Sequence, residues 1–501
     1  MKKDIFRAIM ALFFVFLAVV SSSYIYSAKY EANDKKKEKN KSEISKDYGE
    51  NYNEIGFNLP VVVIDTNGNQ VQTDDTTNSN VMIYDNKGDK LNYIYDSPKV
   101  ESKATIKIRG NSTTYFPKKQ YSLNLIDKKG KEKKEKLLGM DKDSEWVLNG
   151  PFVDKSLMRN YLSYTIANNI MGYAPDVKFC EVFVVDDGSN KLEEKHYKGV
   201  YIMIEKIKRS EDRVDISKAQ DSSDETSFII SKDRNKIGDI SIDSYGNETY
   251  IYDYKLNINY PKKKLTKEKY EYISKYVSEF ERVLYSDKFN DPINGYEKYI
   301  DVDSFVDYYI INEFLNNTDA GVLSTYFHKD YNEKLKAGPV WDFNRSMGNC
   351  NPDFKKPFDY TGFLMIERSW FDRLMEDVRF SSKVVDRYKE LRKTFLSDEY
   401  ILNLIDETKL YLGDAVDRNF KAWPIDMCNQ ADMIKEWGIF RDNQYETKEV
   451  HEMFYKNKHS WKDTTGKAKS YDEEIKFLKE FIVQRGNWMD ENIDSLKKWS
   501  K

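Results

Sequence analysis

The chain has 501 residues, of which 40% are hydrophobic and 14% aromatic, so it can form one large domain or two to three ordinary ones. Charged residues make up 33% of the chain, but the formal net charge is only −4, which argues against a general nucleic-acid-binding protein. The three cysteines lie far apart and the four histidines form no HExxH pattern, so we expect neither a disulfide framework nor a histidine-based metal centre.

The first 28 residues are a candidate export segment. Lys2 and Lys3 precede an uncharged, mainly apolar stretch over residues 8–20, which is typical of a signal peptide or, if uncleaved, of an N-terminal membrane anchor. Residues 29–53 are polar and charged, so we interpret them as a solvated tether. We therefore expect an extracytoplasmic protein that is secreted or membrane-anchored, with a folded domain over residues 54–501.

The first part of this domain is typical of a β-sheet. Alternating or continuous apolar runs that end at turn residues predict strands, and one helix is expected after the capping residues 154–156. The predicted strands are 61–64, 81–84, 105–108, 120–125, 181–185 and 199–204, and the helix covers 157–170.

The second part is typical of helices. Apolar side chains at helical spacing predict helices over 266–285 and 303–315, and the same spacing continues from Trp370 nearly to the C-terminus. A β-rich half over about 54–260 followed by a helical half over about 261–501 predicts an α+β fold with two lobes.

Two aspartates frame a predicted β-hairpin. Asp319 follows the helix over 303–315, and Asp342 follows two short strands, 324–329 and 335–340, that are joined by the polar turn 330–334. Because a hairpin brings its two ends together, we expect both carboxylates to face one cleft. The order of helix, aspartate, hairpin and Asp-Phe is the layout of the catalytic segment of protein kinases.

Phosphoryl transfer requires two carboxylates in such a place. One orients the acceptor hydroxyl and takes its proton, and Asp319 suits this role; the second holds Mg²⁺ against the phosphates, and Asp342 suits that one. Neither a GxGxxG loop nor a GxxxxGK[ST] motif occurs, so the residues alone predict a two-carboxylate magnesium site. The alternative is that both aspartates are turn residues.

Several segments in order resemble the spore-coat protein H (CotH) family of atypical protein kinases. They lie between about residue 60 and residue 495 and include Arg109-Gly110-Asn111 and Gly338-Pro339-Val340-Trp341-Asp342-Phe343. The other matching segments are 117–121, 138–140, 146–150, 154–160, 199–207, 317–319 and 485–488. The resemblance implies an atypical two-lobed protein-kinase-like fold, and an ATP- and Mg²⁺-dependent (or Mn²⁺-dependent) serine kinase that acts on exported, spore-coat or cell-surface proteins.

The resemblance also implies residue roles. Asp319 would be the catalytic aspartate and Asp342 the metal ligand. Lys119 is the candidate for contacting the phosphates, with Lys118 as the competing choice, and Glu205 either pairs with that lysine or only ends a strand.

Two further residues are candidates for binding the nucleotide. Arg109 either binds phosphate oxygens or forms a structural ion pair. Trp341 either stacks on adenine or packs between the lobes. Asp154 and Arg159 are interpreted as helix and packing residues.

One departure from the family pattern concerns the second metal ligand. Ser324 stands at the spacing from Asp319 where the family usually has Asn, and Asn344 stands where many members have an acid. A serine hydroxyl can bind Mg²⁺, so we keep Ser324 as a candidate metal ligand. The alternative function is a catalytically weak, pseudokinase-like protein for coat assembly or adhesion, and no nucleic-acid partner is expected.

Overall fold

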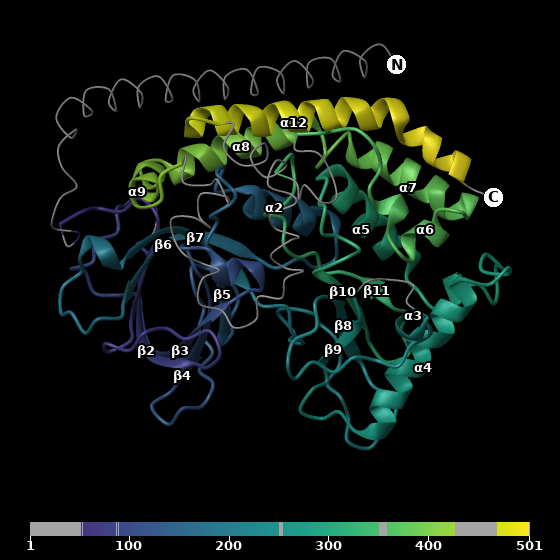
Figure 1. The fold of residues 1–501 in the computed structure, drawn as a ribbon, viewed down its shortest axis with the longest axis horizontal. Coiled ribbons are helices and arrows are strands. Elements are labelled where there is room, and N and C mark those ends of the chain that lie inside the picture. Colours follow the sequence, from purple (N-terminus) through teal and green to yellow (C-terminus); the bar gives the residue numbers. More distant parts are fainter. Residues whose placement is uncertain are drawn as a thin grey trace, which may run out of the picture. The chain divides into compact units, whose positions relative to one another are not determined.

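The N-terminal half of the protein is built around a closed β-barrel of seven strands (Figure 1). The computed structural model describes residues 52, 54–86, 88, 90–249, 254–349, 358–425 and 468–499. The strand order around the barrel is β1-β2-β3-β4-β5-β7-β6, and all neighbouring pairs are antiparallel except β1 and β6, whose parallel pairing closes the barrel. The strands are β1 (Val61–Asp65), β2 (Thr77–Tyr84), β3 (Val100–Arg109), β4 (Gln120–Ile126), β5 (Glu145–Asn149), β6 (Val177–Val185) and β7 (Tyr197–Glu205).

Strands β6 and β7 are buried on both faces, because side chains alternate between the barrel interior and the helices outside. Cys180 and Val182 of β6 belong to the core inside the barrel, whereas Phe179 belongs to the larger core that the helices share. On β7, Met203 points inward and Ile202 outward in the same way. Two-sided burial explains why both strands are almost continuously apolar.

A second sheet of four strands lies in the other half of the domain. Its order is β11-β10-β8-β9, and it consists of β8 (Phe228–Lys232), β9 (Leu256–Tyr260), β10 (Thr325–Lys329) and β11 (Lys336–Ala337). Strands β10 and β11 form a hairpin, with Phe327 opposite Ala337.

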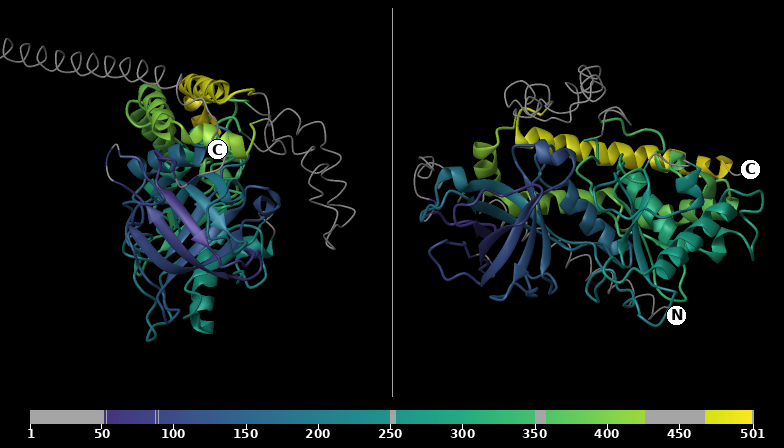
Figure 2. Two further views of the ribbon diagram at one scale, coloured as in Figure 1. Left: turned by 90° about the vertical axis from the view of Figure 1, so that its left-hand side faces the viewer. Right: turned by 60° about the horizontal axis from the view of Figure 1, so that its bottom comes forward.

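Helices cover one side of the barrel and pack against the second sheet. They are α2 (Arg159–Ile170), α3 (Tyr245–Glu248), α4 (Lys267–Leu284), α5 (Val302–Phe314), α6 (Phe371–Leu374), α7 (Val378–Leu391), α8 (Asp398–Leu412), α9 (Ala415–Ala422) and α12 (Tyr471–Asn492). Helix α9 packs on β7, α12 packs on α8 and α5, and the views agree that α8, α9 and α12 lie on one side of the barrel (Figures 1 and 2).

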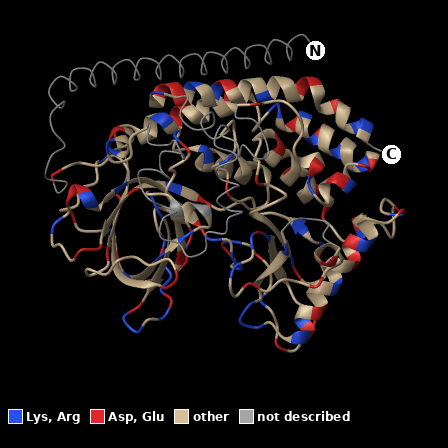
Figure 3. Ribbon diagram, viewed as in Figure 1, with Lys and Arg blue, Asp and Glu red and all other residues tan. Residues whose placement is uncertain are grey.

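Local chemistry accounts for the helix starts. The side chains of Thr266, Asp301 and Ser470 accept hydrogen bonds from the first-turn amides of α4, α5 and α12, which otherwise lack partners. Charges of both signs alternate along α4 and α7, in keeping with the small net charge (Figure 3). In the described part of the chain, no helix is both long and apolar enough to cross a membrane.

The predicted two-lobed protein-kinase-like fold is wrong. Instead of an open kinase lobe, the N-terminal half closes into a barrel, because Val61–Asp65 pairs with Glu181–Val185. Periodicity indicates that a segment is a strand but not which distant strand it pairs with, so closure was not visible in the sequence. Strands β5, β8 and β9 were also not predicted.

All described helices and strands belong to one compact unit, Asn53–Lys501. The predicted signal or anchor over residues 1–28 and nearly all of the tether over 29–53 lie outside the described residues. Both therefore stay predictions.

Candidate phosphoryl-transfer site

Asp319 lies in a short loop between α5 and β10. Its backbone N–H donates to Oδ1 of Asn317 (3.3 Å), and its carbonyl oxygen accepts from the N–H groups of Val322 (3.1 Å) and Leu323 (2.7 Å). The preceding Thr318 donates from both its amide and its hydroxyl to one carbonyl oxygen of the segment that follows Asp342. The loop is thus folded on itself, and the half-buried Asp319 side chain belongs to a defined turn.

Asp342 stands just beyond strand β11 and is held by helix α2. Its backbone N–H donates to Oη of Tyr164 (3.1 Å), and the N–H of Phe343 donates to Oδ1 of Asn160 (2.7 Å). Asp342 has a left-handed backbone conformation with φ of +64°, which Asp adopts more readily than most residues other than glycine. Helix α2 therefore fixes the direction in which this half-buried carboxylate points.

The two carboxyl groups share one electrostatic environment. Burial raises the pKa of Asp342 to about 7, and the charge of Asp319 is the next cause of that rise. Burial likewise raises the pKa of Asp319, and the positive charges of Arg345, Arg234 and Arg368 oppose this rise. The β10–β11 hairpin accordingly brings both ends of the predicted catalytic segment into one site.

A third aspartate, Asp233, belongs to the same site. Its charge raises the pKa of both Asp319 and Asp342, and burial raises the pKa of Asp233 itself. Thr325, the first residue of β10, pairs with Lys232, the last residue of β8. Ser324, just before β10, and Asp233, just after β8, therefore lie at neighbouring ends of these two strands.

Sequence reasoning missed Asp233 because strand β8 was not predicted. The available signal was the apolar run of Phe228, Ile229 and Ile230, with an acid three residues after its end. Ser324, the candidate metal ligand, is half-buried at the start of β10, with φ of +51°.

The barrel contributes Arg109, the last residue of β3. Its guanidinium carbon lies 5.7 Å from the centre of the Trp341 ring, and its positive charge opposes the rise in the pKa of Asp342. Trp341 also packs near Tyr164 and Tyr326, with ring centres 6.0 and 6.5 Å away. The structure thus brings Arg109 and Trp341 to the aspartates, and Trp341 is at the same time a packing residue between the barrel and the second sheet.

The two candidate lysines are engaged elsewhere. Lys119 donates to the carbonyl oxygen of Thr114 (2.7 Å), and burial lowers its pKa. Lys118 is buried and donates to the carbonyl oxygen of Val200 and to Oδ1 of Asn419 (2.7 Å each), and burial holds its pKa well below the ordinary range.

Glu205 lies far along strand β7 from the residue that Lys118 contacts. Val200 and Glu205 are five residues apart on this strand, which corresponds to roughly 16 Å. Glu205 forms an ion pair with Arg213 (2.5 Å) and accepts from Oη of Tyr173 (3.2 Å), and burial raises its pKa to about 7. The structure does not bring Glu205 together with either lysine.

The donor set of the site suits a hard cation. Mg²⁺ prefers oxygen ligands and typically takes only one or two protein carboxylates, with phosphate and water oxygens completing its coordination. Asp342 and Asp319 offer such oxygens, and Ser324, which directly precedes β10, carries a hydroxyl of the same kind. Among the described residues no group of three His, Cys, Asp or Glu side chains is arranged to hold a metal ion.

Comparison with known proteins places the chain in one family. The family model described as "CotH kinase protein" matches residues 106–489, which include the second sheet and the three aspartates. A search of curated proteins found no match. The match covers well over half of the sequence, and the chain therefore belongs to the CotH kinase protein family.

Proposed function

We propose that this protein is an ATP- and Mg²⁺-dependent protein kinase that phosphorylates serine residues of exported, spore-coat or cell-surface proteins. The observation that carries the proposal is the meeting of Asp319 and Asp342 at the two ends of the β10–β11 hairpin, where the charge of one raises the pKa of the other. Membership of the CotH kinase protein family supports the same reaction class.

Asp319 acts as the general base. Burial raises the pKa of its carboxyl group, and a base whose pKa is closer to the working pH transfers protons more effectively. In the transfer step the serine hydroxyl gives its proton to Asp319, a bond forms between the serine oxygen and the γ-phosphorus, and the bond from that phosphorus to the β–γ bridging oxygen breaks. ADP leaves with the electron pair of the broken bond.

Asp342 and Ser324 are the protein ligands for the cation. When bound, Mg²⁺ would neutralise the charge that develops on the phosphate oxygens. In this proposal Arg109 binds a phosphate oxygen and the Trp341 ring stacks on adenine; the effect of the Arg109 charge on the pKa of Asp342 and the 5.7 Å between Arg109 and the Trp341 ring support these roles. Lys119 and Glu205 stay candidates from the family resemblance, with no contact between them that would support the assignment.

The test is transfer of label from [γ-³²P]ATP by the full-length protein with Mg²⁺ or Mn²⁺. We expect phosphoserine on the protein itself or on a serine-rich acceptor. Asp342→Ala should abolish labelling, and Asp319→Asn should reduce the rate by about 10² to 10⁴, the usual contribution of a general base. Asp303→Asn is the matched control, because Asp303 is an exposed carboxylate on α5 and should leave the rate unchanged.

Three results would redirect the proposal. If the folded wild-type protein transfers no label to authentic exported partners, the alternative role in coat assembly or adhesion would be favoured. Label arriving from [α-³²P]ATP would indicate nucleotidyl rather than phosphoryl transfer. Full activity of both Asp319→Asn and Asp342→Ala would contradict the assignment of these two aspartates to the reaction.

A further inference from the structure

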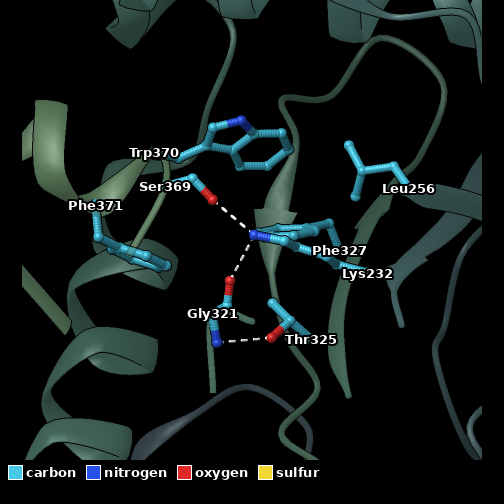
Figure 4. A pocket seen from close by; sticks show the side chains of 8 residues that line it. All are labelled: Lys232, Leu256, Gly321, Thr325, Phe327, Ser369, Trp370 and Phe371. Carbon is cyan, nitrogen blue, oxygen red and sulfur yellow. Dashed lines mark hydrogen bonds between the residues drawn. The ribbon is translucent and has the colours of Figure 1, made fainter. Parts of the chain in front are cut away.

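A buried lysine lies directly behind the loop that carries Asp319. Lys232 is the last residue of β8 and only 5% exposed. Its ammonium group donates to the carbonyl oxygen of Gly321 (2.7 Å) and to the hydroxyl of Ser369 (2.6 Å), as Figure 4 shows. The other residues that line this small pocket are mainly apolar: Leu256, Phe327, Trp370 and Phe371, with Thr325 at its edge.

Gly321 is two residues from Asp319, and both of its backbone polar groups are engaged. Its carbonyl oxygen accepts from Lys232, and its N–H donates to Oγ1 of Thr325 (2.8 Å; Figure 4). On the other side of Asp319, Nη2 of Arg368 donates to the carbonyl oxygen of Thr318 (3.1 Å). Cationic donors therefore hold the loop on both sides of Asp319.

No bulkier residue fits at position 321. Gly321 has φ of +76°, and a Cβ atom there would lie 2.7 Å from Cβ and Cγ of Arg368. The loop thus has close packing on the Arg368 side and a charged hydrogen bond on the Lys232 side. Little room remains for a second arrangement of the Asp319 backbone.

A buried ammonium group is costly unless acceptors surround it, so its hydrogen bonds are strong and directional. The aromatic lining of the pocket limits the water that could replace the Gly321 carbonyl as an acceptor. Lys232 therefore strongly favours the loop position in which the Gly321 carbonyl reaches it.

The end of strand β8 contributes to two neighbouring places. Lys232, its last residue, lines the pocket, whereas Asp233, the next residue, contributes its charge to the site of Asp319 and Asp342. A shift of β8 would thus change both the hydrogen bond from Lys232 to the Asp319 loop and the position of the Asp233 charge.

We propose that Lys232 is a positioning residue for the proposed kinase reaction. By its hydrogen bonds to the Gly321 carbonyl and to the Ser369 hydroxyl, it fixes the loop and thereby the position of the Asp319 carboxylate relative to the acceptor hydroxyl. The proposal rests on the proposed function for its kinetic part. Its structural part, the immobilisation of residues 319–323, can be measured without any catalysis.

The kinetic test is Lys232→Met in the full-length protein. Methionine keeps the length of the side chain but removes the donors, so the Gly321 carbonyl loses its partner. We expect kcat to fall about 10- to 100-fold, because a small displacement of a catalytic group has effects of this size. KM for MgATP should change less than about threefold, since the nucleotide is assigned to other residues.

Lys329→Met is the matched control. Lys329 is also buried and also donates to a backbone carbonyl, that of Asp330 (2.9 Å), but it ends β10 at the side opposite Ser324. Its substitution should cost comparable stability and leave kcat within about twofold, because it touches no part of the Asp319 loop. An equal fall of kcat in both variants would overturn the proposal.

Two further variants test the same contact from its other partners. Thr325→Val removes the acceptor of the Gly321 N–H and should lower kcat in the same direction. Ser369→Ala leaves Lys232 with the Gly321 carbonyl, so its effect should be smaller, and it should add nothing to Lys232→Met in the double variant. Independent, additive effects would contradict a shared role.

Hydrogen–deuterium exchange separates this proposal from the proposed function. In Lys232→Met, the amides of Gly321, Val322 and Leu323 should exchange at least about tenfold faster than in the wild type, while those of β11 stay unchanged. If exchange is faster in the variant but the wild-type protein shows no kinase activity, the role of Lys232 in holding the loop is supported and the proposed reaction is contradicted. Unchanged exchange, whatever the activity, would overturn the positioning role of Lys232.

Discussion

The carboxyl group of Asp342 holds a proton to an unusually high pH. Its pKa is raised from 3.8 to about 7, mainly by burial and then by the charge of Asp319. A metal ligand must be deprotonated to bind, so the affinity for Mg²⁺-nucleotide should weaken as the pH falls below about 7. Bound cation would itself lower this pKa by favouring the charged carboxylate.

The same shift makes a prediction for stability. Between pH 3.8 and about 7 the folded protein holds a proton on Asp342 that the unfolded chain has released, so this group's contribution to the free energy of unfolding falls as the pH rises through that window. Asn at position 342 cannot ionise. Asp342→Asn should therefore raise the free energy of unfolding, relative to the wild type, by more at pH 8 than at pH 4. We expect on the order of 1–2 kcal/mol, since partial exposure screens the full effect.

Thermal unfolding at pH 4 and pH 8 checks this expectation. The comparison needed is the difference in Tm between variant and wild type at each pH. Asp303→Asn, an exposed carboxylate on α5, should show little difference between the two values. A stabilisation by Asp342→Asn that is equal at both pH values would show that the carboxyl group titrates normally.

At the scale of elements, helix α2 joins the site to the C-terminal helix. Arg159, its first residue, is fully buried; its Nη1 binds Asp154 (2.6 Å) and Glu474 of α12 (2.7 Å). The same guanidinium donates to the carbonyl oxygens of Ser346 (3.2 Å) and Met347 (3.2 Å), a few residues beyond Asp342. One side chain therefore ties α2, α12 and the segment after Asp342, in agreement with the predicted packing role.

Arg159→Met should be strongly destabilising. It leaves the carboxylates of Asp154 and Glu474 buried without their partner, which typically costs about 3–5 kcal/mol. Equilibrium urea unfolding measures this loss directly. Arg387→Met, which breaks a more exposed ion pair with Asp307 between α7 and α5, should cost at most about 1 kcal/mol. Similar losses for the two variants would show that the Arg159 network contributes no more than a surface pair.

At the scale of the whole domain, the barrel and the helices are not separable. The outward-facing residues of β6 and β7 belong to the same hydrophobic core as α5, α7 and α12. Helix α9 adds a buried ion pair from Arg418 to Glu181 of β6 (2.6 Å). The barrel thus depends on the C-terminal helices to cover one of its outer faces.

A fragment of residues 54–216 should therefore fail to fold stably on its own. It retains every barrel strand and α2 but lacks the C-terminal helices, which in the whole domain share one hydrophobic core with side chains such as Val200 and Ile202. We expect aggregation or binding of a hydrophobic dye, with weak near-ultraviolet circular dichroism compared with the full-length protein. A soluble fragment with a cooperative unfolding transition would contradict this dependence.

The elements that could be predicted are those determined by neighbouring residues. The helix expected over 266–285 is α4, because Thr266 caps it and apolar side chains recur at helical spacing. The hairpin between Asp319 and Asp342 was predicted because its two strands are joined by a short polar turn, and it forms as β10 and β11. The effect of the Asp319 charge on the pKa of Asp342 is consistent with that local geometry.

Tertiary structure alone decided the rest. Closure of the barrel joins Val61 to Glu181, and the arrival of Asp233 and Arg109 at the site depends on pairings between strands far apart in the chain. The separation of Glu205 from Lys118 and Lys119 has the same origin. Capping and periodicity report hydrogen bonds within a few residues, whereas the partner of a strand is selected by packing across the whole domain, and so only the folded chain shows it.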